Sequence, residues 1–154
     1  MISSIIRKVT GRHPLYPSWV GDVVNDGQAQ IMDTQRVETW FNEGHSFLSP
    51  CGSTGKDLLY HLQEHPKEWE RNLGYQDGIW LAEHTQFLDR SEFLERWGDC
   101  AYLALWGTVV RHRRQKNLWV ACLVRNQNGK GWHTSWTPVV RDCSNYSPGL
   151  RFKD

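Results

Sequence analysis

A run of basic residues, Arg111 to Lys116, has the clearest chemical potential in this sequence. Its four permanent cations within six positions repel one another unless an anion or an acidic surface accepts them. Tryptophans flank the run. Cations beside aromatic rings are typical of sites for single-stranded nucleic acid, where phosphates are neutralised and bases are stacked. We therefore predict an anion-binding site, with nucleic acid as the first ligand to consider, formed by Arg111, Arg113, Arg114, Lys116, Trp106, Trp119, Trp132, Arg125 and Lys130.

The charges are unevenly divided along the chain. Residues 1–100 carry nine Lys/Arg and fifteen Asp/Glu, a net charge of −6, whereas residues 101–154 carry nine and two, a net charge of +7. Such asymmetry indicates an anionic partner, either single-stranded nucleic acid or an acidic protein surface, or the pairing of copies in a homo-oligomer. Two simpler interpretations stay open: the regions neutralise each other within the fold, and the basic run is a solvated hairpin end.

Histidines raise the question of a metal site. His61 and His65 are four residues apart in a predicted helix, so both rings can face one ion, and His45 and Cys51 precede them. No Cys-x-x-Cys pair accompanies them, although zinc sites often contain one. The favoured interpretation is that His61 faces solvent and His65 caps the next helix, so we expect neither a bound metal nor a cofactor.

A glycine-rich stretch, Gly52 to Lys56, resembles a phosphate-binding loop that leads into a helix. It departs from the Walker pattern, because Pro50 stands where that pattern has Gly and Asp57 stands where it has Ser or Thr. Thr54 and Asp57 instead form a pair like a capping box. The stretch therefore predicts a capped helix start.

Nucleophilic catalysis has no local signature in this chain. Cys100 lies beside Asp99 and Cys143 beside Asp142, but a triad is defined by geometry and no spacing selects a trio. Cys122 alternates with apolar residues and is expected to pack in the core. A small enzyme is nevertheless the alternative function, with a cysteine or histidine in a pocket beside the strand face that carries His133, Ser135 and Thr137.

The overall composition is that of one globular domain spanning residues 1–154. Of its residues 39% are hydrophobic and 23% are charged, as in ordinary folded proteins, and nine are tryptophans. We expect a cytoplasmic protein with reduced cysteines and no membrane span, because the opening residues have no secretory pattern and no run approaches about 18 apolar residues.

Two kinds of element alternate before residue 100. Hydrophobic periodicity and caps predict strands at 2–10, 19–24 and 79–82, with a turn at 25–27. The same signals predict four short helices, at 33–44, 56–65, 66–74 and 89–98.

The last third of the chain has the clearest strand pattern. Strands are predicted at 101–110, 118–125 and 131–140, with Asn128-Gly129 as a hairpin turn. The first two are apolar on both faces and should be central, with Trp106 and Val110 on the same face. The third is apolar on one face and polar on the other, which suits an edge strand or a strand that faces a site.

The predicted fold is therefore α+β: a mainly antiparallel sheet that ends in a three-strand C-terminal meander, with three to four short helices packed against it. The first functional hypothesis is a small binding or regulatory protein that uses this basic, tryptophan-flanked meander to engage an anionic partner. A small enzyme and a protein-interaction or inhibitor module are the alternatives.

Overall fold

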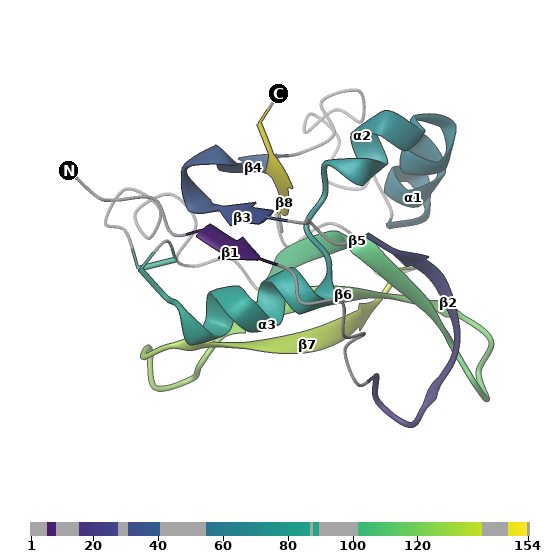
Figure 1. Cartoon of the computed structure of the whole chain (residues 1–154). Helices are drawn as coiled ribbons and strands as arrows, with labels where there is room; N and C mark the ends of the chain where they lie inside the picture. The colour runs from purple at the N-terminus through teal and green to yellow at the C-terminus, as the bar shows by residue number, and fades with distance from the viewer. Residues whose placement is uncertain are drawn as a thin grey trace, which may run out of the picture.

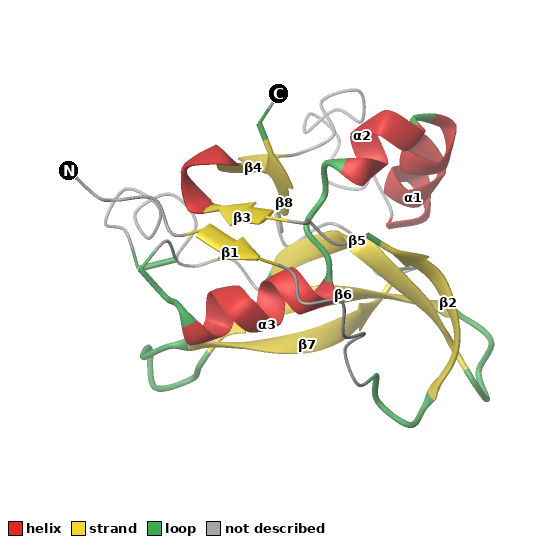
Figure 2. Cartoon of the chain, in the orientation of Figure 1, coloured by secondary structure: helices red, strands yellow, loops and turns green. Residues whose placement is uncertain are grey.

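The computed structural model describes residues 6–8, 16–27, 31–40, 55–86, 88–89, 102–139 and 148–153. Its strands are β1 (Ile6–Lys8), β2 (Val20–Asp26), β3 (Ile31–Asp33), β4 (Val37–Trp40), β5 (Leu103–His112), β6 (Leu118–Arg125), β7 (Trp132–Pro138) and β8 (Gly149–Phe152). Its helices are the 3-10 turn η1 (Thr34–Arg36) and the α-helices α1 (Gly55–Glu64), α2 (Pro66–Glu70) and α3 (Tyr75–Glu83). Figures 1 and 2 show an α+β fold in which short helices lie against a twisted sheet.

The three predicted consecutive strands are confirmed as β5, β6 and β7. Each pairs antiparallel with the next. The β6–β7 turn closes through Gly129 and Gly131, whose φ values of 72° and 77° lie in the left-handed region that glycine adopts at low cost. β7 is an edge among the described strands, as its half-polar pattern predicts.

The meander does not end the sheet, so the predicted topology is only partly right. The order is β4-β8-β5-β6-β7, and β2 also pairs with β5. The last strand, β8, lies between β4 and β5, antiparallel to the former and parallel to the latter. The result is a six-strand, mostly antiparallel sheet, while β1 and β3 form a separate ribbon.

Two hydrophobic clusters cover the two faces of the sheet. Side chains alternate along a strand, so neighbours such as Leu103 and Ala104 point to opposite faces. The first cluster joins α3 to one face and includes Leu81, Leu103, Leu105, Ala121, Leu123 and Trp132. The second joins α1 to the other face and includes Leu59, Leu62, Ala104, Trp106, Val109 and Val120. The prediction that β5 and β6 are central and covered on both sides is therefore confirmed.

A bulge in β5 overturns the predicted placement of Val110. Leu105 pairs with Ala121 and Val109 with Val120, so three residues of β5 face no partner on β6. An odd insertion exchanges the faces, which places Val110 opposite Trp119, away from Trp106.

Three predictions before residue 100 are wrong. Residues 37–40 form β4 instead of a helix, because β8 supplies a partner strand; Asp33 caps only η1, accepting a hydrogen bond from the backbone of Gln35 (3.0 Å). Residues 79–82 lie in α3, whose start is fixed by Asp77, which accepts a hydrogen bond from the backbone of Gly74 (2.9 Å). Asn25 and Asp26, predicted as a turn, extend β2.

The helices on the other face agree better with prediction. α1 covers the predicted 56–65 helix within one residue at each end, and α2 begins at Pro66 as predicted but ends at Glu70. Residues 90–98 of the helix predicted at 89–98 lie outside the described residues. So do residues 52–54 of the glycine-rich stretch, whereas Gly55 and Lys56 begin α1. In the part of the chain that the structure describes, no helix is long and apolar enough to cross a membrane.

Opposite charges from the first hundred residues and from the last third of the chain meet beside β4 and β8. Arg151 donates to Glu38 through Nε at 2.9 Å, and Arg71 lies 3.5 Å from the same carboxylate. Arg151 also lies 3.7 Å from Glu68. Part of the positive charge of residues 101–154 is therefore neutralised by acidic residues of the first hundred.

Candidate nucleic-acid interface

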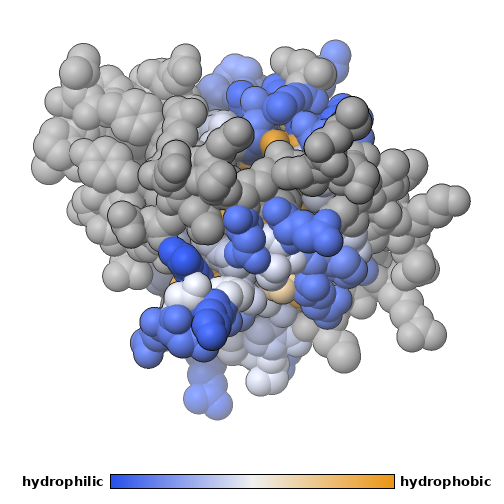
Figure 3. Space-filling view, turned by 90° about the vertical axis from the view of Figure 1, so that its left-hand side faces the viewer, coloured by the Kyte–Doolittle hydropathy of each residue, from blue (hydrophilic) through white to orange (hydrophobic). Residues whose placement is uncertain are grey.

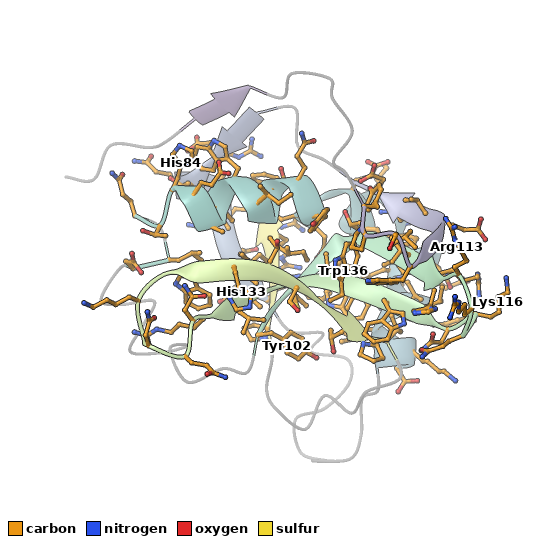
Figure 4. The ribbon with its side chains drawn as sticks, turned by 90° about the horizontal axis from the view of Figure 1, so that it is seen from below. His84, Tyr102, Arg113, Lys116, His133 and Trp136 are labelled. Carbon is orange, nitrogen blue, oxygen red and sulfur yellow. The ribbon has the colours of Figure 1, made fainter. Side chains whose placement is uncertain are left out.

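The basic run forms the turn between β5 and β6, which we name the basic tip (residues 111–116). Its chain reverses by backbone hydrogen bonds between His112 and Asn117 (2.9 Å) and between Lys116 and His112 (3.0 Å). Lys116 adopts a φ of 63°, the left-handed conformation that closes the turn. Arg113, Arg114 and Lys116 are exposed at this end of the sheet, where Figure 4 shows Arg113 and Lys116.

Arg111 differs from the other three cations. It pairs with Leu118, so it lies on the face of the sheet opposite Val110 and Trp119. Its guanidinium donates to the carbonyl of Lys116 at 2.9 Å, and Asp22 lies beside it in the register of β2. Arg111 therefore holds the tip together, and an acidic neighbour offsets its charge.

His112 connects the tip to an aromatic ring. Its Nδ1 accepts hydrogen bonds from the backbone N–H groups of Arg114 and Gln115, both at 3.1 Å, so this nitrogen carries no proton. Its ring stacks on Trp19, with centroids 5.2 Å apart and planes inclined by 16°. The carbonyl of Trp19 accepts from the backbone of Arg113 at 2.7 Å. The conformation of the tip is thus coupled to that of the tryptophan.

Six half-buried rings form a contiguous group, which we name the aromatic cluster. Trp19 contacts Trp119 at 5.4 Å and Trp136 at 5.6 Å, and Trp136 contacts Tyr75 at 4.8 Å between centroids. Tyr16 stacks on Tyr75 at 5.9 Å. In Figure 4, Trp136 lies on the sheet between His133 and the end that carries the tip. The members are Tyr16, Trp19, Tyr75, His112, Trp119 and Trp136.

Trp119 and Tyr16 show how the cluster is held. The Trp119 indole donates to the side chain of Asn117 at 3.1 Å, which orients a ring that is partly open to solvent. Burial raises the pKa of the Tyr16 phenol well above its ordinary value, and the neighbouring Asp26 adds to the increase. Tyr16 therefore stays neutral at physiological pH and contributes an uncharged ring to the aromatic cluster.

Of the three tryptophans predicted for stacking, only Trp119 belongs to this cluster. Trp106 and Trp132 are each 5% exposed, in the clusters on the two opposite faces of the sheet. The carbonyl of Trp106 accepts from the indole of Trp69 at 2.7 Å. Both rings therefore pack the core. Their places as solvent-facing rings are taken by Trp19 and Trp136, which sequence reasoning left out of the site.

Arg125 and Lys130 lie at the other end of the sheet. β6 separates the two hairpin ends by roughly 25 Å, and the opposed ends are visible in Figure 1. Arg125 donates to the carbonyl of Gly129 at 3.1 Å, within the β6–β7 turn. The coloured residues on this side of the molecule are mostly hydrophilic (Figure 3). The nine predicted site residues therefore form no single surface.

The histidine pair is placed differently from its prediction. His61 does not simply face solvent, because its Nε2 lies 2.9 Å from Glu68 Oε2. His65 occupies the cap position of α2, but its side chain makes no capping hydrogen bond and its Nδ1 bonds the carbonyl of His61 at 2.8 Å. His45 and Cys51 lie outside the described residues.

The reactive groups expected for an enzyme gain no support from the described residues. Cys122 is buried and free, as predicted for a packing residue, and burial raises its pKa to about 12. It therefore stays a protonated thiol at neutral pH and is a poor nucleophile. His133 bonds Asn126 at 2.6 Å in the neighbouring turn, and Thr137 is buried. Cys51, Cys100 and Cys143 lie outside the described residues.

Replacing His112 by alanine is expected to lower the free energy of unfolding by about 1–2 kcal/mol. The variant loses the acceptor of two backbone N–H groups and the ring stacked on Trp19. Urea denaturation followed by fluorescence measures the loss. His84→Ala is the control, because the exposed His84 also stacks on a tryptophan but bonds one carbonyl of α3 instead of accepting from turn N–H groups. A larger loss at His84 than at His112 would contradict the role given to His112.

No protein-family model, curated protein or solved structure matches this chain. What the protein does is therefore inferred from its own side chains.

Proposed function

We propose that this protein binds single-stranded nucleic acid through the basic tip and the aromatic cluster. One observation carries the proposal: partly exposed rings and exposed cations are joined in one structure, since Trp19 bonds the backbone of Arg113 and stacks on His112. Single-stranded binding needs both elements, because phosphates require positive charge and unpaired bases require flat apolar surfaces.

The roles within the site follow from position. Arg113, Arg114 and Lys116 neutralise phosphates, since all three are exposed at the turn. Trp119 and Trp19 offer ring surface to bases, because each is held in place but only half-buried. Arg111, on the other face, supports the turn. Double-stranded nucleic acid is a poorer ligand for this geometry, because its bases are already stacked on one another.

A salt titration tests the proposal. Short single-stranded DNA or RNA should quench the tryptophan fluorescence, and three phosphate contacts predict a roughly 15-fold loss of affinity between about 50 and about 200 mM salt. Trp119→Phe should reduce the quenching more than the affinity, since a smaller ring still stacks. Trp80→Phe is the control, because Trp80 stacks on His84 outside the aromatic cluster.

A second polyanion tests the two roles in the proposal separately, namely charge neutralisation by the basic tip and base stacking by the aromatic cluster. Heparin carries charge without bases, so it should bind with a similar salt dependence but without the quenching. If heparin binds as tightly as the oligonucleotide, then the tip recognises charge alone and the stacking role is wrong. If no oligonucleotide binds at low salt, then the proposed function is wrong altogether.

A protein-interaction function has its own supporting observation. Val23 and Val24 are 42% and 38% exposed on β2, which pairs only with β5 among the described strands. An exposed strand edge with apolar side chains can accept another strand. Register shifts within β2 work against such pairing, because bulges disrupt the regular spacing of edge donors and acceptors. The nucleic-acid proposal is therefore the better supported of the two.

A further inference from the structure

Two histidines and a glutamate converge where α1 turns into α2. His61 lies in the last turn of α1, His65 follows it, and Glu68 lies in α2. One ligand-capable atom from each lies within 4.8 Å of the others. The two imidazole rings stack with centroids 4.3 Å apart, and His61 Nε2 lies 2.9 Å from Glu68 Oε2. This histidine–glutamate group is separate from the basic tip.

The elbow between the helices is fixed by the backbone. Pro66 has no N–H to donate and begins α2, while the N–H of His65 bonds Leu62 at 3.1 Å and that of Trp69 bonds His65 at 3.0 Å. Leu62 is fully buried and Trp69 packs against the same cluster, so both sides of the elbow are anchored in the core. The three side chains are therefore presented from a rigid support.

The hydrogen bonds prepare the two rings differently. A carbonyl oxygen only accepts, so His65 Nδ1 carries a proton and the lone pair of its Nε2 is left for a ligand. A backbone carbonyl that fixes the tautomer in this way is a common partner of metal-bound histidines. His61 Nε2 donates to the carboxylate of Glu68. Zinc would bind Nε2 of the tautomer that carries its proton on Nδ1, so the ring proton must pass from Nε2 to Nδ1 through solvent as the ion enters.

Glu68 is restrained from its other side. Its Oε1 lies 3.7 Å from Arg151, which is itself held by Glu38 at 2.9 Å. Oε2 points to His61, and the side chains of His61 and Glu68 are 25% and 27% exposed. The carboxylate is therefore oriented, yet the pair is accessible to an ion from solvent.

We propose that His61, His65 and Glu68 bind a divalent zinc ion, with water as the fourth ligand. Zinc–ligand distances of about 2.0–2.1 Å in a tetrahedron place ligand atoms about 3.3 Å apart. His61 and Glu68 need to separate by only a few tenths of an ångström from 2.9 Å. Because two nearly parallel rings cannot both direct a nitrogen lone pair at one ion, the exposed His65 ring must tilt out of its stack on His61 to close the remaining distance. Two imidazoles with one carboxylate favour zinc over calcium or magnesium, which prefer oxygen ligands.

His84 provides a matched control within the same chain. Its Nδ1 bonds the carbonyl of Trp80 at 2.9 Å, and its ring stacks on that residue at 4.2 Å. This repeats the geometry of His65 on His61, but with a tryptophan in place of the second histidine. In the described residues the three-ligand group occurs only at His61, His65 and Glu68. If exposure alone made a histidine bind zinc, then His84 would contribute to zinc binding as much as His65 does.

Zinc binding is measured by competition with a fluorescent zinc chelator and by thermal unfolding of the full chain. At about a hundredfold excess over the dissociation constant, zinc should raise the Tm by roughly 5 °C or more, whereas calcium should not. His65→Ala and Glu68→Gln should each weaken zinc affinity by about tenfold or more, whereas His84→Ala should leave it unchanged. Cobalt in place of zinc should give visible bands without the charge-transfer band of a thiolate ligand.

Three outcomes would overturn the proposal. These are zinc affinity unchanged in both His65→Ala and Glu68→Gln, an equal loss in His84→Ala, and no stabilisation by zinc at any concentration tested. His65 is exposed, so its alanine variant is expected to fold, and a Tm measured without zinc verifies this directly. Loss of zinc binding in that folded variant, with His84→Ala unaffected, supports the site.

Discussion

Replacing Gly107 by alanine is expected to destabilise the protein by about 3 kcal/mol or more, which lowers the Tm by roughly 10 °C. Gly107 lies in the β5 bulge, where the segment between α2 and α3 crosses the sheet. An added Cβ would lie 2.5 Å from the carbonyl oxygen of Asn72 and 2.8 Å from that of Leu73. These are backbone atoms, so no side-chain rotation relieves the contact.

The same glycine also joins three segments by hydrogen bonds. Its N–H donates to Leu73 at 2.9 Å, and its carbonyl accepts from the backbone of Gly27 at 2.6 Å and from the side chain of Asn25 at 2.7 Å. Displacing Gly107 to admit a methyl group therefore strains β2 and the α2–α3 connection together. Urea denaturation, followed by the fluorescence of the nine tryptophans, measures the loss.

Gly129→Ala is the control for backbone strain. A Cβ at Gly129 meets nothing within 4 Å, but its φ of 72° disfavours alanine, so a loss of about 1 kcal/mol is expected. The difference between the two variants isolates the steric contribution. Equal losses of unfolding free energy in the two variants would mean that the β5 bulge moves to accommodate the methyl group. Its contact with the α2–α3 segment would then not be rigid.

Reversing the charges of Arg114 and Lys116 together is expected to weaken oligonucleotide binding roughly hundredfold at moderate salt. Both side chains are exposed in the basic tip. Arg113 is left unchanged, because its guanidinium donates to Val20 at 3.2 Å and helps to hold β2. Glutamate at position 116 has the same strain as lysine there, so the free energy of unfolding should change by less than about 0.5 kcal/mol.

Arg125→Glu with Lys130→Glu is the matched control. It produces the same net charge at the opposite end of β6, beyond the reach of short-range contacts with the tip. Its affinity for the oligonucleotide should fall by less than about threefold. Equal losses in the two double variants would mean that the overall charge attracts nucleic acid without a defined site. An undiminished affinity in the Arg114/Lys116 variant would exclude the tip.

The parts of the fold that could be predicted from sequence are those in which local signals suffice. β5, β6 and β7 were found because long apolar strands are separated by turn residues, and Asn128-Gly129 marks a hairpin by its backbone preferences. α1 was found for a similar reason, since Leu58, Leu59 and Leu62 form a stripe with helical spacing. These elements depend little on distant partners.

The predictions of secondary structure fail where contacts with residues distant in the sequence determine which element forms. Residues 37–40 satisfy a helical pattern, but β8, more than a hundred residues later, offers them a strand. The pattern of residues 79–82 predicts a strand, but these residues lie in α3, whose first turn is capped by Asp77. The bulge in β5 carries only a weak signal, the glycine at 107, and it exchanged the faces of Val109 and Val110.

The candidate site, like the fold, could be predicted from the sequence only in part. A cluster of cations at a hairpin end could be read from the chain, because Arg111 to Lys116 are contiguous. The aromatic rings that accompany these cations could not be predicted from the sequence. Trp19 and Trp136 lie far from residue 112 in sequence, and they reach it because β2 pairs with β5 and β6 pairs with β7.

The sequence by itself determined the strand meander, the basic hairpin end and the helix that carries His61, because periodicity and turn residues act over a few positions. The tertiary structure alone decided which tryptophans are buried, which cations share a surface, and that Glu68 meets two histidines at one elbow. The physical reason is that exposure and proximity depend on how strands pair and which faces are covered. These are properties of contacts between residues distant in the chain.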